Sequence, residues 1–198
     1  MRTITFNEVL CQAAELAGRD RTGIPNDDAT LLRGVLSSAV RRRWTAAPWR
    51  ELIRVEERTV TGGTISRTET DKTTIGEVMN VYDLDFRDEA SAAPVPWADF
   101  DTEICLLGWD DTATAWAEFW IENPSLLSMG ENERNDYGLP ERFGEMLALE
   151  GAGHLLRVDG RTQEGNELLQ LAESRWTEEA AAAWQLRDGA TRVEYRMP

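Results

Sequence analysis

The first 49 residues carry the apolar spacing of two helices. Thr5 to Glu8 read as a capping box, in which the threonine and glutamate side chains each satisfy a backbone N–H at a helix start. Apolar residues then recur three or four positions apart as far as Gly18, which is helical spacing. A second apolar stripe begins after Pro25, runs from Leu32 to Trp44 and predicts a second helix.

From residue 50 onward the apolar period changes from helical spacing to alternation. Strand-like runs flank Gly62-Gly63, which is typical of a hairpin. Further strands are predicted at Ile75–Tyr82 and Thr102–Leu107. The run Ala113–Ile121 alternates with apolar bulk on both faces, which favours a strand covered on both sides. A helix from Ala113 to Glu122 is the alternative, because alanine favours helices.

The last third of the chain returns to helical spacing. Residues Glu122 to Gly138 read as a polar loop, and a helix then opens with Pro140 at its first position. Asp159-Gly160 reads as a turn. A final helix is predicted from about Thr162 to Arg187, with Gly189 ending it. The tail beyond that glycine alternates like a strand but has no hairpin partner beside it.

Together these elements predict an α+β fold for the 198 residues. We expect a helical bundle of two N-terminal and two C-terminal helices, with a β-rich insertion between them and an extended C-terminal arm. Residues 1–49 and 139–189 would form one helical domain. Residues 50–138 would form the inserted β-rich domain, and residues 190–198 the arm.

Charge narrows the function classes. The chain carries 36 acidic and 21 basic side chains, a formal charge of −15, which repels nucleic acid phosphates and disfavours a DNA- or RNA-reading module. Lys72 is the only lysine among the basic residues, and there are eight tryptophans. Arginine and tryptophan are enriched in interface cores, although a GC-rich codon bias also yields arginine. No apolar run has the length of a membrane span or a signal peptide, so we expect a soluble protein made in a cytoplasm.

No complete set of catalytic or metal-binding residues is evident. His154 is the only histidine, and with Glu150 four residues earlier it supplies half a metal site at most. A structural histidine on a helix face is the favoured interpretation. Cys11 and Cys105 have only His154 as a partner for nucleophilic catalysis, and no nucleophile-elbow motif is present. We therefore expect no enzyme activity, no cofactor and no bound metal.

Two acidic clusters raise the question of calcium. Asp83, Asp85, Asp88 and Glu89 form one, and Asp99, Asp101 and Glu103 form the other. Neither completes a known calcium ligand pattern, so a solvated acidic face is the favoured interpretation of both.

Three groups of residues in this layout resemble the head-to-tail adaptor (connector) proteins of tailed bacteriophages, including the tail tubular protein A type. The first group is the opening helix pair leading into Arg42-Arg43-Trp44-x-x-x-Pro48-Trp49. The second is Ile75–Tyr82 with Val95-Pro96-Trp97, Ala115–Phe119 and Asn123-Pro124. The third runs from Leu139-Pro140-Glu141-Arg142-Phe143 through Leu155-Leu156-x-x-x-Gly160 to Leu168-x-x-x-Ala172-Glu173. Gly165 departs from the layout, because a helix former is expected there, and it points to a late start of the last helix.

The resemblance implies a structural virion protein at the head–tail junction, made in the host cytoplasm. Such adaptors form a ring, usually a dodecamer, beneath the portal, join the DNA-filled head to the tail and provide part of the DNA ejection channel. The implied partners are further copies of the chain, the portal protein and a tail or nozzle protein, with DNA only as transiting cargo and no membrane. The alternative function is an acidic DNA-mimic inhibitor of a nucleic-acid enzyme, which shares the negative charge.

Candidate interface residues lie at the end of the second helix and near the C-terminus. They are Arg41, Arg42, Arg43, Trp184, Arg192, Val193, Tyr195 and Arg196. The arginine run either complements the helix dipole or grips an acidic partner. The tail is predicted to be an unpaired strand that adds to the portal or a neighbouring subunit, with an ordinary frayed terminus as the alternative.

Overall fold

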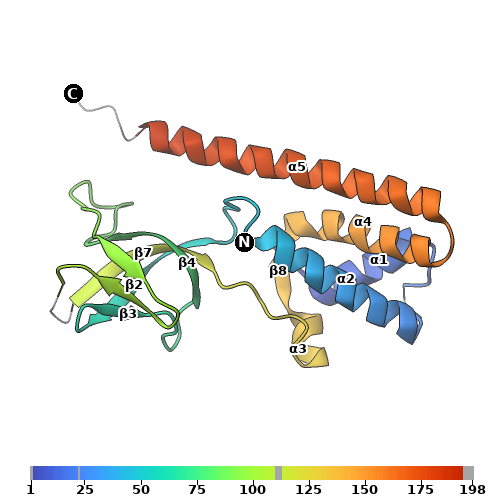
Figure 1. The fold of residues 1–198 in the computed structure, drawn as a ribbon, viewed down its shortest axis with the longest axis horizontal. Coiled ribbons are helices and arrows are strands. Elements are labelled where there is room, and N and C mark those ends of the chain that lie inside the picture. Colours follow the sequence, from blue (N-terminus) through green and yellow to red (C-terminus); the bar gives the residue numbers. More distant parts are fainter. Residues whose placement is uncertain (1, 22, 110–112, 194–198) are drawn as a thin grey trace. The chain divides into compact units, whose positions relative to one another are not determined.

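The computed structural model describes residues 2–21, 23–109 and 113–193, and the chain divides into two units (Figure 1). Met1–Trp49 and Pro124–Pro198 form the first, which we call the helical unit. Arg50–Asn123 forms the second, which we call the β unit. Each unit has its own buried core and is described by itself below.

The helical unit begins with the predicted capping box. Glu8 N–H donates to Thr5 Oγ1 at 3.2 Å, and Thr5 N–H donates to Glu8 Oε2 at 2.8 Å, so this prediction is confirmed. The elements of the unit are β1 (Thr3–Thr5), α1 (Phe6–Leu16), α2 (Asn26–Trp44), α3 (Glu131–Asp136), β8 (Gly138–Pro140), α4 (Glu141–Val158) and α5 (Thr162–Val193).

Helix α4 is the centre of the helical unit. Glycines let its neighbours approach closely, because a Cβ on Gly151 would lie 2.9 Å from the Ala13 Cβ of α1. On another side of α4, a Cβ on Gly165 of α5 would lie 2.6 Å from the Gly153 carbonyl oxygen. Helix α5 begins at Thr162, so the late start predicted from Gly165 is wrong. The glycine lies inside the helix because it allows the close packing against α4. Figure 1 shows α5 running alongside α4 and continuing past it.

Four aromatic rings fill the core of the helical unit beside α4. Phe143 lies at the centre of the group, with ring centroids 5.0 Å from Trp176, 5.3 Å from Trp49 and 6.3 Å from Trp44. The interplanar angles of these pairs lie between 75° and 83°, which is the favourable edge-to-face arrangement. The indole N–H of Trp49 donates to the Arg43 carbonyl at 2.6 Å, so its burial leaves no polar group unsatisfied.

The β unit is one antiparallel sheet of six strands. Its strands are β2 (Ile53–Thr61), β3 (Thr64–Ser66), β4 (Ile75–Tyr82), β5 (Trp97–Asp99), β6 (Glu103–Leu106) and β7 (Ala113–Ile121). The spatial order is β4-β7-β2-β3-β6-β5. The β7 segment pairs with β2 on one side and β4 on the other, so the strand prediction is confirmed over the helix alternative.

The sheet curves until its two edges almost meet. Val95 N–H donates to the Val81 carbonyl at 2.8 Å, and Asp83 N–H donates to the Ala93 carbonyl at 3.2 Å. These bonds tie the end of β4, at one edge, to the segment that leads into β5 at the other edge. Such closure satisfies backbone groups that an open sheet edge leaves unpaired.

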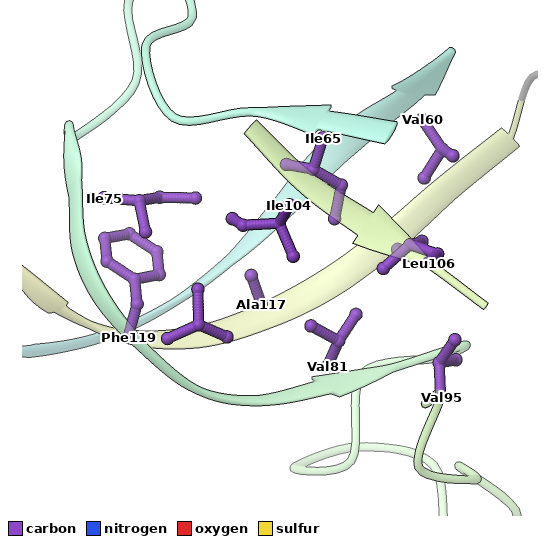
Figure 2. Close-up of a cluster of buried hydrophobic side chains, with 11 residues drawn as sticks. Val60, Ile65, Ile75, Val81, Val95, Ile104, Leu106, Ala117 and Phe119 are labelled. Carbon is purple, nitrogen blue, oxygen red and sulfur yellow. The ribbon is translucent and has the colours of Figure 1, made fainter. Parts of the chain in front are cut away.

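The concave side of the sheet holds the core of the β unit, shown in Figure 2. Alternate residues of β7 point inward, and Ala115 and Ala117 are small enough for the tight curvature beside Phe119. The buried cluster is Val60, Ile65, Ile75, Val78, Val81, Val95, Ile104, Leu106, Ala115, Ala117 and Phe119.

One charged residue, Arg58, is fully buried in the β unit. Its Nη2 donates to Glu56 Oε2 at 2.9 Å and to the Thr73 carbonyl, and its guanidinium carbon lies 4.9 Å from the Phe119 ring centroid. Burial lowers the pKa of Arg58, while the carboxylates of Glu56 and Glu69 raise it. The ion pair and the ring contact together make a buried guanidinium tolerable.

The predicted fold class is wrong. The described residues form an α+β structure of five helices and an antiparallel, nearly closed six-stranded sheet, rather than a helical bundle that carries a β-rich insertion and an extended arm. Closure joins β4 to the segment before β5 across the loop between them, and backbone pairing of this kind leaves no mark in the local apolar period. The structure also groups residues 124–138 with the helices, where β8 pairs with β1.

The predicted end of the last helix is also wrong. Helix α5 passes through Gly189 and ends at Val193, so residues 190–193 are helical rather than part of an extended strand. A glycine inside a helix costs only about 1 kcal/mol relative to alanine, which a helix of 32 residues can accommodate. The rest of the predicted arm, residues 194–198, lies outside the described residues.

Candidate functional site

A groove of about 510 Å³ opens on the surface of the helical unit beside α2. Two small residues one turn apart, Gly34 and Ser38, line it from α2, and a Cβ built on Gly34 would meet no atom within 4 Å. Leu31 and Val35, also one turn apart, supply apolar lining, and Leu127 adds to it from the segment before α3. The groove therefore arises where small residues of α2 lie beside larger branched ones.

Polar groups converge at one end of this groove. Arg42 of α2 donates from Nη2 to Glu150 of α4, whose side chain is 7% exposed, whereas the side chain of Arg42 is 56% exposed. His154 lies one helical turn beyond Glu150 and lines the groove with Arg42. Burial lowers the pKa of His154, the Glu150 carboxylate raises it, and the positive charges of Arg157 and Arg42 lower it further.

These groups suit binding better than chemistry. Glu150 pairs with Arg42, and His154 lies on α4 one turn further along, the helix-face position that the sequence favours for it. Among the described residues, no three His, Cys, Asp or Glu side chains are arranged to hold a metal ion. An apolar floor with a basic group at one end fits an apolar side chain that lies beside a carboxylate.

The predicted arginine run makes contacts inside the helical unit. Arg42 binds Glu150 of α4 and Arg43 binds Glu173 of α5. The Arg43 guanidinium carbon also lies 5.3 Å from the Trp176 ring centroid. Two of the three arginines therefore join α2 to α4 and α5. Arg41 is exposed at the end of α2.

The other candidate interface residues lie on or beyond α5. Trp184 is 45% exposed on this helix, and the Arg187 guanidinium carbon lies 5.7 Å from its ring centroid. Arg192 and Val193 belong to the last turn of α5 rather than to a strand. Tyr195 and Arg196 lie outside the described residues. Of the eight predicted residues, the six that the structure describes lie on two helices, α2 and α5.

Local partners engage three residues of the two acidic clusters. Asp85 accepts two hydrogen bonds from Arg87, at 2.8 and 2.7 Å, and these bonds lower the pKa of Asp85. Asp83 accepts a hydrogen bond from the Ala93 N–H at 2.7 Å, and Asp99 pairs with Arg67. These bonds hold the loop after β4 and the start of the β5–β6 hairpin, which is a structural role.

The negative charge of the chain is concentrated in one unit. Arg50–Asn123 contains 17 acidic and six basic side chains, a formal charge of −11. The helical unit contains 19 acidic and 15 basic side chains, a formal charge of −4. The β unit is therefore the strongly acidic part of the chain.

Sequence reasoning missed the groove. Its signal was the pair of small residues, Gly34 and Ser38, one turn apart on α2, together with Leu31 and Val35 beside them. Only the structure adds Leu127, which is distant in sequence and 66% exposed.

No helix among the described residues is long and apolar enough to cross a membrane. No protein-family model matches the chain, and no curated protein matches its sequence.

Proposed function

We propose that this chain is a head-to-tail adaptor of a tailed bacteriophage. It forms a ring beneath the portal, joins the DNA-filled head to the tail and provides part of the DNA ejection channel. The partners are further copies of the chain, the portal protein and a tail or nozzle protein. The protein acts as structure in the virion and not as an enzyme.

The observation that carries the proposal is the uneven distribution of charge. A conduit must let DNA pass without holding it, and a wall of like charge repels phosphates. The β unit, at −11, has that property, while the helical unit, at −4, supplies a packed scaffold of four aromatic rings and interhelical ion pairs. The layout that resembles adaptors adds to this support.

Exposed apolar side chains in both units also support an assembling subunit. Leu127 and Leu186 are 66% and 70% exposed in the helical unit, and Phe100 and Leu107 are 55% and 54% exposed in the β unit. A ring subunit needs two different surfaces that contact its two neighbours. Contiguous apolar patches mark such surfaces, and these four side chains are the candidates for contributing to them.

Two measurements test the proposal. Electron microscopy of the purified chain, alone and with the portal protein encoded in the same genome, is expected to show rings with a central channel and retention of the portal. A chain that stays a monomer and does not bind portal rings would contradict the proposal. A monomer that instead binds and inhibits a nucleic-acid enzyme would favour the DNA-mimic alternative.

The charge argument has its own test. Replacing Glu57, Asp88 and Glu89 of the β unit by lysine is expected to leave ring formation intact and to make the rings retain duplex DNA at low salt. The matched control replaces Glu15, Glu133 and Glu145, three exposed residues of the helical unit, and keeps the same net charge. DNA retention by both triple variants alike would show that the charge is not placed toward the DNA path.

A further inference from the structure

An exposed phenylalanine is held on a rigid turn of the β unit. Phe100 joins β5 to β6 and is 55% exposed. Its N–H donates to the Glu103 carbonyl at 3.0 Å, and its own carbonyl accepts a hydrogen bond from Arg67 Nε at 3.1 Å. Arg67 also donates to the Asp99 carboxylate and to the Gly76 carbonyl. One mostly buried arginine thus fixes both the turn and the residue before it.

Such rigidity has a binding consequence. An aromatic side chain buries a large apolar area on association, and a small number of such residues usually supplies most of the binding energy of an interface. A turn already held in place loses little conformational entropy when it binds. Phe100 also lies between two acidic residues, Asp99 and Asp101, in a unit of formal charge −11. The turn therefore presents an apolar projection flanked by carboxylates.

The groove beside α2 has the complementary features. Its volume of about 510 Å³ exceeds what one phenylalanine side chain needs, and Leu31, Val35 and Leu127 supply apolar walls. Arg42 lines the groove with more than half of its side chain exposed; its Nη2 donates to Glu150, and the other N–H groups of the guanidinium can meet a carboxylate next to the inserted ring. The volume, the apolar lining and the guanidinium of the groove thus suit the Phe100 turn.

We propose that the groove above Gly34 receives the Phe100 turn of a second copy of this chain. Phe100 enters between Leu31, Val35 and Leu127, and the exposed Asp101 carboxylate faces Arg42. Projection and groove lie on different units, so each copy offers one of each. The proposed contact is head-to-tail, and such a contact closes into a ring when the rotation allows. The inference rests on the proposed function in that it assigns the contact between ring neighbours.

The test uses sedimentation velocity of the full chain and two variants. Phe100→Ala removes the projection, and Gly34→Leu fills the groove at a position where a side chain meets no other atom. Each is expected to weaken self-association at least about tenfold. Two matched controls, Leu84→Ala at another exposed apolar residue of the β unit and Gly34→Ala, are expected to stay within about threefold of the parent chain. Circular dichroism verifies that every variant is folded.

A mixture of the two variants gives the decisive result. Phe100→Ala keeps an open groove and Gly34→Leu keeps the projection, so a head-to-tail contact predicts a dimer of one copy of each and no larger species. A parent chain that stays monomeric, or a mixture that forms no dimer, would overturn the assignment. Rings that persist in both variants would overturn this contact while leaving the adaptor proposal standing. Open chains that lose their contact in both variants would support the contact and contradict the closed ring.

Discussion

Gly165→Ala places a methyl group in the closest contact between α4 and α5. The new Cβ would lie 2.6 Å from the Gly153 carbonyl oxygen and 2.7 Å from Arg157 Cγ. The carbonyl belongs to the helix backbone, so it cannot rotate away, and either the helices separate or α4 distorts. Overpacking of this kind costs about 3 kcal/mol, and the better helix propensity of alanine returns about 1 kcal/mol. We expect a net loss of about 2 kcal/mol.

The matched control is the same substitution in open surroundings. Gly34 lies in the interior of α2, and a Cβ there would meet nothing within 4 Å. Gly34→Ala therefore gains helix propensity with no clash and is expected to stabilise the helical unit by about 1 kcal/mol. The two variants differ by one methyl group each and are expected to move stability in opposite directions.

Thermal and urea unfolding followed by circular dichroism measure both changes. For a unit of this size, we expect the Tm of Gly165→Ala to fall by roughly 6–8 °C and that of Gly34→Ala to rise by roughly 3–4 °C. The transition of the β unit should not move, because neither glycine belongs to it. Equal shifts of the same sign in the two variants would refute the close approach of α4 and α5 at Gly165.

Two further predictions concern single polar contacts. Thr5→Ala removes the cap of α1 and should lower the stability of the helical unit by about 1 kcal/mol. Hydrogen bonds from the backbone N–H and hydroxyl of Thr5 lower the pKa of Glu8, so the stabilising effect of the Glu8 carboxylate is present above its unfolded pKa and is lost as the pH falls through its folded pKa. Glu8→Gln should abolish that part of the pH dependence of urea unfolding. An unchanged pH profile in this variant would contradict the capping box. In the β unit, Glu56→Ala should destabilise more than Arg58→Met, because the first leaves a buried guanidinium without its carboxylate and the second replaces it with an apolar chain. A larger loss for Arg58→Met in equilibrium unfolding would contradict this account of Arg58.

Local chemistry made several elements predictable from the sequence. The capping box at Thr5 and Glu8 starts α1 because its two bonds join residues three positions apart. The alternation from Ala113 to Ile121 identifies β7 because a strand shared between two neighbours buries alternate residues. In both cases the signal in the sequence lies within one short segment.

Features that depend on distant partners were not predictable in this way. The pairing of Thr3–Thr5 with Gly138–Pro140 joins segments far apart in the chain, and the closure of the sheet joins β4 to a segment beyond the loop that follows it. Gly189 is a residue type that often follows the end of a helix, but α5 continues through it. A glycine ends a helix only where its backbone adopts the left-handed conformation. The partners of Arg42 and Arg43 lie more than 100 residues away, so their sequence run looked available for binding.

Native mass spectrometry of the purified chain tests the central claim most directly. An adaptor that forms a ring predicts one dominant closed species of twelve copies of the 22.3 kDa chain that persists on dilution. A single species at 22.3 kDa across the accessible concentration range would contradict the assignment of this chain as a ring-forming subunit.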